Sequence, residues 1–159
     1  MHSLERTGPA FLEMAHGIVW ASVATIDKDN RPRSRVLHPY WEWEGSTLVG
    51  WVATGATQTK RSHLEHSPYL SVNYWSDAQN TCVAECRGSW HFDLETREKV
   101  WNTYLELPEP LGYDPAIIPG WETFESETFA VLKLEPWRLR VFPASMLFEG
   151  SGEVLVWEA

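Results

Sequence analysis

The sequence predicts a mainly β domain, a six- or seven-stranded antiparallel barrel with two or three short helices at its sides. The first observation is size, since 159 residues with 43% hydrophobic composition suffice for one domain with its own core. The second is a series of β-branched and aromatic runs divided by tight turns, which favours antiparallel neighbours. The third is that few segments have helical spacing. A barrel leaves fewer exposed strand edges than a sandwich, the alternative packing.

The N-terminal half is predicted to be a helix followed by a three-stranded meander. Residues 7–16 have the composition of a short helix, with Thr7 as its cap and Gly17 at its end. Small and β-branched residues then predict a strand over 18–26. Further strands are expected at 33–43 and 47–53, after turns at 27–32 and 44–46.

The C-terminal half is predicted to alternate between helices and strands. Thr57 is placed to cap a helix over 57–66, which Pro68 ends. Residues 107–120, rich in Pro and Gly, predict a loop whose length favours a functional flap over a plain linker. The other expected elements are strands at 69–75, 81–92, 128–135, 137–142 and 153–157, and a helix at 94–105.

The overall charge restricts the classes of partner. The chain has 13 Lys and Arg against 22 Asp and Glu, a formal net charge of −9. This argues against nucleic-acid or anionic-membrane binding, because both need a large positive field. No apolar run approaches the roughly 20 residues of a membrane span, and no secretory signal is visible at the N-terminus. We therefore expect a cytoplasmic protein with a small-molecule partner.

Cys82 and Cys86 are too few for a disulfide framework. Four residues apart on a predicted strand, they would lie about 13 Å apart along one face, beyond disulfide reach. We expect both to be packing residues.

Basic residues gather in one part of this acidic chain, which predicts a small anionic ligand. Strand alternation places Arg31, Arg33 and Arg35 on one side of a strand. A solvated strand face is an open alternative for the first two, whereas Arg35 lies deeper, before an apolar pair, and favours a functional role. Six of the 13 basic residues form this group: Lys28, Arg31, Arg33, Arg35, Lys60 and Arg61.

A second candidate element joins a strand end to a helix start at residues 54–61. Hydroxyls, free backbone N–H groups and a lysine at a helix N-terminus suit a phosphate. A simple helix cap with an exposed lysine is the alternative. The residues concerned are Thr54, Gln58, Thr59 and Lys60.

These two elements, in this order on this strand pattern, resemble the flavin-binding split-barrel superfamily of pyridoxamine 5′-phosphate oxidase-like proteins. The resemblance runs from about Ile18 to Trp75, with a weaker echo at residues 129–142. It depends on the joint spacing of several short pieces: Ala-Ser-Val-Ala-Thr-Ile-Asp, Arg-Pro-Arg-Ser-Arg-Val-Leu, Thr54-x4-Thr59-Lys60, Leu64-x3-Pro68 and Leu70-Ser-Val.

The resemblance implies a homodimer with two flavins bound across the subunit interface. The family's strand arginine and helix-start lysine, which hold the FMN phosphate, match Arg35 and Lys60. A hydroxyl in the same loop points to Thr59, with Thr54 and Gln58 as neighbours. The backbone of Val36, Leu37 and His38 would run beside the isoalloxazine ring.

The chain departs from the oxidase proper, so oxidation of pyridoxamine phosphate is not expected. Gln58-Thr59-Lys60 stands where the oxidase has Ser-Arg-Lys, which removes one phosphate cation. Tyr40 aligns with a second lysine, and the C-terminal Arg-Leu-x-Pro ending is absent.

Three functional hypotheses follow. The first is an FMN-dependent oxidoreductase of unknown substrate, and the second is a reductase that uses the deazaflavin F420 in the same groove. The third is a flavin- or haem-binding module without turnover. His38 and Tyr40 are candidate polar groups at the flavin edge. The Trp41, Trp43 and Trp51 rings could frame a flat ring or form core.

Other chemistries have weaker signals. His63 and His66 have a spacing that could bind a metal, but two surface histidines are favoured and no metal is expected. No Gly-x-Ser-x-Gly motif is present for nucleophilic catalysis.

Overall fold

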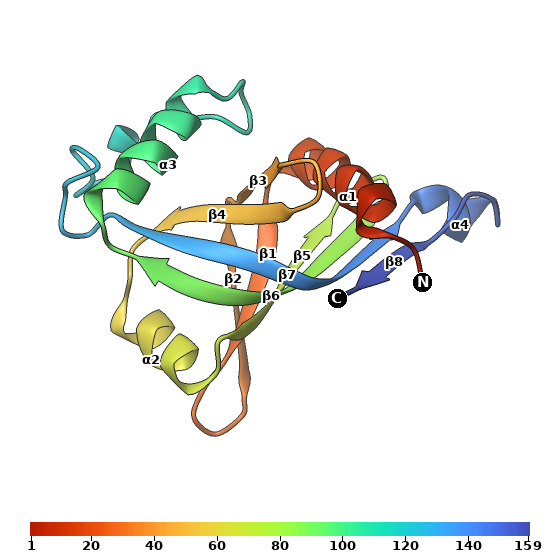
Figure 1. Ribbon diagram of the computed structural model, residues 1–159, viewed down its shortest axis with the longest axis horizontal. Helices are drawn as coiled ribbons and strands as arrows, with labels where there is room; N and C mark the ends of the chain where they lie inside the picture. Colours follow the sequence, from red (N-terminus) through yellow and green to blue (C-terminus); the bar gives the residue numbers. More distant parts are fainter.

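The computed structural model describes residues 1–159 as one antiparallel sheet with helices around it (Figure 1). Seven strands follow in the order β2-β1-β5-β6-β7-β4-β3, and β8 pairs with β7 beside this path. The path is not closed, because no hydrogen-bonded ladder joins β2 to β3. The predicted mainly β split barrel with flanking helices is therefore confirmed, with eight strands in place of six or seven, and β8 matches the strand expected at 153–157.

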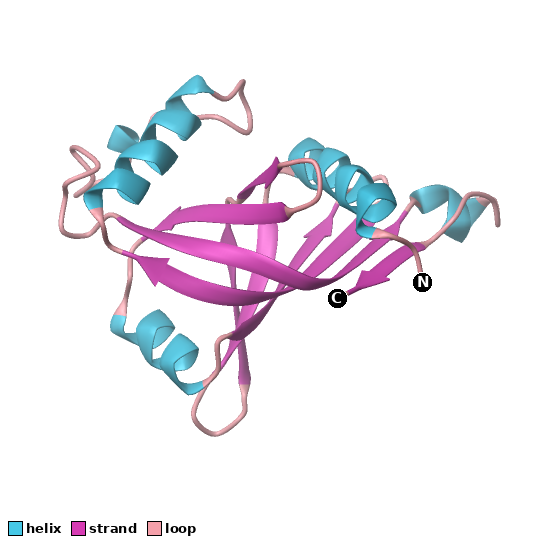
Figure 2. Cartoon of the chain, in the orientation of Figure 1, coloured by secondary structure: helices cyan, strands magenta, loops and turns pink.

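The elements are bounded as follows. The strands are β1 (Ala21–Ile26), β2 (Pro32–Leu37), β3 (Tyr40–Trp43), β4 (Leu48–Thr54), β5 (Tyr69–Trp75), β6 (Thr81–His91), β7 (Ala130–Phe142) and β8 (Leu155–Glu158). The helices are α1 (Leu4–Ile18), α2 (Gln58–His66), α3 (Leu94–Glu106), a 3-10 turn η1 (Pro115–Ile117) and α4 (Ala144–Phe148). Figure 2 shows α1, α2 and α3 placed around the strands, and long loops beside α3.

The first helix is longer than predicted. It follows Ser3 and ends at Ile18, so Thr7 is not its cap and Gly17 is not its end. Thr7 is instead fully buried within the helix. Phe11 and Ala15 share its buried face, and this apolar face continues the helix past the local stop signals.

The predicted and observed strand boundaries differ at two prolines, Pro39 and Pro136, and only Pro39 lies at a break between strands. The predicted strand at 33–43 is two strands, because His38 and Pro39 interrupt it and proline cannot donate to a ladder. The predicted break at Pro136 is wrong, since β7 runs unbroken through it. A register shift opposite Glu85 and Cys86 admits this proline into the sheet.

The remaining elements agree with the predictions to within a few residues. The strand predicted at 69–75 matches β5, and Thr57 caps α2 by accepting a hydrogen bond from the Lys60 backbone N–H. The short helix α4 was not predicted.

Side chains on the two sides of the sheet form two separate cores. The first lies under α1, where Phe11 packs edge-on to Trp41 and the Trp41 indole donates to the Tyr74 hydroxyl at 2.9 Å. Cys82 and Cys86 lie in the same core with no exposed surface, which confirms them as packing residues.

The second core joins α3 to β4 and β7. Tyr40, Trp51, Tyr104 and Phe129 belong to it. Because α3 and the loop after it are held by this core, the loop has a fixed place beside the sheet.

None of the helices is long and apolar enough to cross a membrane.

The two ends of the chain meet (Figure 1). The His2 backbone N–H donates to the Val156 carbonyl at 2.7 Å, and the Val156 N–H donates to His2 Nδ1 at 3.0 Å. Glu153 accepts hydrogen bonds from the side chains of His2 and Arg6. The N-terminal arm is thereby fastened to the last strand.

The turn between β1 and β2 predicts a specific acid sensitivity. Backbone N–H groups of Arg31 and Asp29, together with the Arg31 guanidinium, bind the Asp27 carboxylate and lower its pKa from 3.8 to about 2. Because the pKa is lowered in the folded state, the ionised Asp27 carboxylate stabilises the fold at pH values above its unfolded-state pKa. This stabilisation is lost as the pH falls from about 4 towards 2. We expect Asp27→Asn to be less stable at neutral pH and to lack this part of the acid-induced loss. Urea unfolding between pH 2 and pH 7 would measure it, and parallel curves for both proteins would contradict it.

Candidate functional site

Arg35 turns inward from β2. It pairs with Val23 across the β1–β2 ladder, so its side chain lies on the same side as that buried valine. Its Nη1 donates to the Val23 carbonyl at 3.2 Å and to Thr25 Oγ1 at 2.8 Å. The guanidinium is half-buried, as its deeper position on the strand predicts.

Lys60 reaches the same region from α2. Only three residues join the end of β4 to the start of α2, so the first turn of the helix lies beside the last residue of the strand. Lys60 Nζ donates to the hydroxyl of that residue, Thr54, at 2.5 Å.

The two cations have no anionic partner in the chain. Neither Arg35 nor Lys60 is within 4.0 Å of a carboxylate, although the chain carries 22 acidic residues. Burial lowers the pKa of Arg35, and burial together with the Arg35 charge lowers the pKa of Lys60. Two half-buried like charges destabilise a fold unless an anion offsets them. We call Arg35 and Lys60 the cation pair.

The neighbouring arginines differ from Arg35. Arg31 binds Asp27 at 3.0 Å and Asp29 at 2.6 Å, and Arg33 lies 3.7 Å from Asp27. Carboxylates of the β1–β2 turn therefore neutralise both, in keeping with the alternative of a solvated strand face.

A polar cleft of about 420 Å³ adjoins these residues. Gln58 and Thr59 are exposed and lie on its wall, and neither side chain bonds to Arg35 or Lys60. The cleft is lined by Asp27, Lys28, Arg31, Arg33, Gln58, Thr59, Ser62 and His63.

His63 is a residue that sequence reasoning misplaced. Predicted as a surface histidine, it is 5% exposed, and its Nδ1 lies 2.9 Å from Thr25 Oγ1. His66 is exposed and approaches Asn30 at 3.4 Å. No three His, Cys, Asp or Glu side chains are grouped so as to hold a metal ion.

An apolar cavity of about 300 Å³ lies next to the cation pair. Two of its lining residues, Val36 and Ala53, are the chain neighbours of Arg35 and Thr54, so the cavity uses the same stretches of β2 and β4 as the cation pair but from their opposite faces. The lining residues are Trp20, Val36, Leu37, His38, Ala53, Pro110, Tyr113, Ile117, Ile118 and Trp121.

His38 is held by aromatic rings at this cavity. Its ring stacks on Tyr113 with a centroid distance of 5.1 Å and meets Trp20 at 4.7 Å. The Tyr104 hydroxyl donates to the His38 carbonyl. Burial lowers the pKa of His38, which favours a neutral ring at pH 7. The loop at 107–120 supplies Tyr113 and thus forms one wall of the cavity.

The other aromatic candidates lie elsewhere. Tyr40 is 1% exposed and packs edge-on to Tyr104, behind His38. Trp41 and Trp43 pack in the first core, and Trp51 packs in the second. These four rings are therefore core residues and do not line the cavity.

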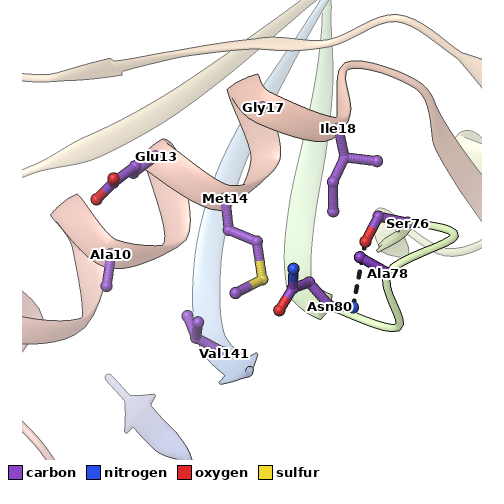
Figure 3. Close-up of a pocket in the computed structure, with 9 residues that line it drawn as sticks. All are labelled: Ala10, Glu13, Met14, Gly17, Ile18, Ser76, Ala78, Asn80 and Val141. Atoms are coloured by element: carbon purple, nitrogen blue, oxygen red, sulfur yellow. Dashed lines mark hydrogen bonds between the residues drawn. The ribbon is translucent and has the colours of Figure 1, made fainter. Parts of the chain in front are cut away.

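The largest cavity, about 590 Å³, lies between α1 and the turn after β5 (Figure 3). Its polar groups serve the fold, since the Asn80 N–H donates to Ser76 Oγ and Asn80 Oδ1 accepts from the Ala144 N–H. Its one ionisable residue is Glu13, an acid. This chemistry does not suit an anion, so we do not assign the functional site there.

No family model and no curated protein sequence matches the chain. Solved structures do match. A protein from Clostridium acetobutylicum, related to general stress protein 26 of B. subtilis and ascribed to the pyridoxinephosphate oxidase family, has a TM-score of 0.70 at 10% identity, over 97% of this chain and 95% of that one.

Two further structures have the same fold and different named ligands. A pyridoxamine 5′-phosphate oxidase-related, FMN-binding protein from Nostoc punctiforme matches with a TM-score of 0.61 at 12% identity, over 100% of this chain and 98% of that one. A heme-binding protein from Mycobacterium smegmatis matches with a TM-score of 0.63 at 15% identity, over 99% of this chain and 59% of that one. The chain therefore has the fold of the pyridoxamine 5′-phosphate oxidase-like, FMN-binding split barrels.

Proposed function

We propose that the chain binds FMN and acts as an FMN-dependent oxidoreductase. The observation that carries this proposal is the cation pair, two half-buried positive side chains without a carboxylate partner, beside an apolar cavity with aromatic walls. A ligand with an anionic end and a flat apolar body complements both parts.

The residues at the site fit the two ends of FMN. Arg35 offers a planar fork of donors and Lys60 a point charge, and Thr54 and Thr59 add hydroxyls. The cavity beside Val36 and His38 offers apolar walls for a ring. Bound flavin supplies the hydride or electron chemistry, so no protein acid or base is required.

A second candidate is a deazaflavin cofactor in the same place. The polar cleft next to the cation pair favours it, because the cleft offers room and basic side chains for a longer anionic tail. FMN is the first candidate because the cation pair alone satisfies a single phosphate.

We further propose that two copies of the chain enclose the ligand. Val36, Ile117 and Trp20 lie at the cavity and are 66%, 69% and 59% exposed in the single chain. Apolar groups of this size beside a ligand site are typical of a surface that a partner covers. Sedimentation of the FMN-loaded protein should give the mass of a dimer, and a monomer would contradict this.

Titration of the purified protein with FMN, a deazaflavin cofactor and haem, followed by absorbance and fluorescence, tests the ligand. We expect saturable binding of FMN. Binding of the deazaflavin alone would favour the second candidate, and binding of haem alone would overturn both. Reduction of the bound flavin by a nicotinamide nucleotide, with reoxidation by an added acceptor, separates an enzyme from a binding module.

A further inference from the structure

Thr25 and His63 form a buried pair next to the cation pair. Thr25 is 3% exposed and His63 is 5% exposed, and they come from β1 and α2, 38 residues apart in the chain. Thr25 Oγ1 has two partners, Arg35 Nη1 at 2.8 Å and His63 Nδ1 at 2.9 Å.

Counting donors and acceptors assigns the proton between these groups. The Arg35 guanidinium can only donate, so the Thr25 oxygen accepts from it. The Thr25 hydroxyl has one proton, and His63 Nδ1 is the partner within reach that can accept it. The reverse arrangement would leave a buried hydroxyl proton without an acceptor, which is costly. The neutral His63 ring therefore carries its proton on Nε2.

Of the two ring nitrogens of His63, Nδ1 is bonded to Thr25 and Nε2 is not fully enclosed by protein. His63 is one of the residues lining that cleft, and its Nε2 makes no hydrogen bond within the chain. A nearly buried ring thus directs an N–H donor into a cleft that also holds Thr59 and Ser62, next to the cation pair.

We infer that His63 is a further phosphate-binding residue of this site, with Thr25 as its positioning residue. The neutral ring donates its Nε2–H to an oxygen of the bound phosphate monoester, while the Thr25 hydroxyl sets the tautomer and anchors Arg35. This inference rests on the proposed function for the identity of the ligand, but the predicted tautomer and the anion site do not depend on flavin.

Two substitutions of His63 separate the roles of its two ring nitrogens. His63→Asn keeps a group near Nδ1 and removes the donor at Nε2, whereas His63→Gln keeps a donor near Nε2. We expect His63→Asn to weaken FMN binding by roughly 10-fold, the effect of one hydrogen bond to a charged group. His63→Gln should stay within a few-fold of the unaltered chain. Riboflavin, which lacks the phosphate, should bind all three proteins alike.

Thr25 supplies a matched control. Thr25→Ser keeps the hydroxyl and should retain FMN affinity, and Thr25→Val removes it and should weaken binding. A purely structural role for His63 predicts the opposite order of the Asn and Gln variants, because Asn keeps the bond to Thr25. That order, or equal binding by all variants, would overturn the inference while leaving the FMN proposal standing.

Imidazole nitrogen NMR provides a readout that needs no flavin. We expect an unprotonated Nδ1 and a protonated Nε2 at His63 in the neutral ring, and titration with inorganic phosphate should shift the Nε2 signal. A protonated Nδ1, or no response to phosphate, would contradict the inference. A phosphate response in a protein that binds no FMN would support the anion site and overturn the proposed function alone.

Discussion

Arg35→Ala is expected to weaken FMN binding by roughly 10- to 100-fold, because it removes the charged fork that can hold two phosphate oxygens. Lys60→Ala should weaken binding by roughly 10-fold, since an ammonium contributes a point charge without a fork. The stability of the ligand-free protein should not fall, because each substitution removes one of two half-buried like charges that have no counter-charge. Fluorescence titration with FMN measures the first effect, and urea unfolding measures the second.

Arg87→Ala is the matched control. Arg87 is exposed on β6 and makes no ion pair, so its loss changes the net charge equally without touching the site. Unchanged FMN affinity in this variant would separate a local contact from a general electrostatic effect. If Arg35→Ala and Lys60→Ala also bind as the unaltered chain does, the cation pair is not the phosphate site.

Gly112→Ala is expected to destabilise the protein by about 3 kcal/mol or more, at the upper end of the overpacking range. A Cβ at this position would lie 1.8 Å from the Leu107 carbonyl oxygen and 2.9 Å from the Tyr104 carbonyl oxygen. Both are backbone atoms, so the loop itself must move. Because the next residue, Tyr113, stacks on His38, this movement should also disrupt the apolar cavity.

Gly17→Ala is the control for this substitution. Gly17 lies within α1 and has no neighbour within 4 Å of an added Cβ, so alanine should be neutral or stabilising by up to about 1 kcal/mol. Urea unfolding, monitored by tryptophan fluorescence, compares the stability of the two variants. Equal stability of Gly112→Ala and the unaltered chain would show that the loop does not occupy this position.

Local signals were sufficient for much of the fold. The β5 strand and the Thr57 cap depend on neighbouring residues, and both were predicted from sequence. The continuity of β7 through Pro136 was not, since it depends on a register shift set by β6.

The candidate site was predictable in part for the same reason. Strand alternation places three arginines on one side of β2. It does not show that Asp27 forms ion pairs with Arg31 and Arg33 and leaves Arg35 unpaired. The burial of His63 comes from the packing of α2 on β1, and no short-range pattern encodes that contact.

The order of the strands has a consequence for biosynthesis. All residues of the cation pair and its threonine partners lie before residue 61, yet β4 is held in the sheet by β3 and by β7, which begins at Ala130. A nascent chain on the ribosome that has exposed only its first half therefore has no fixed place for Thr54 or Lys60. Synthesis proceeds at about 5–20 residues per second, so β7 follows α2 by several seconds. The proposed FMN site is therefore complete only after β7 has emerged, and a chain truncated before that strand should retain Arg35 and Lys60 without the site.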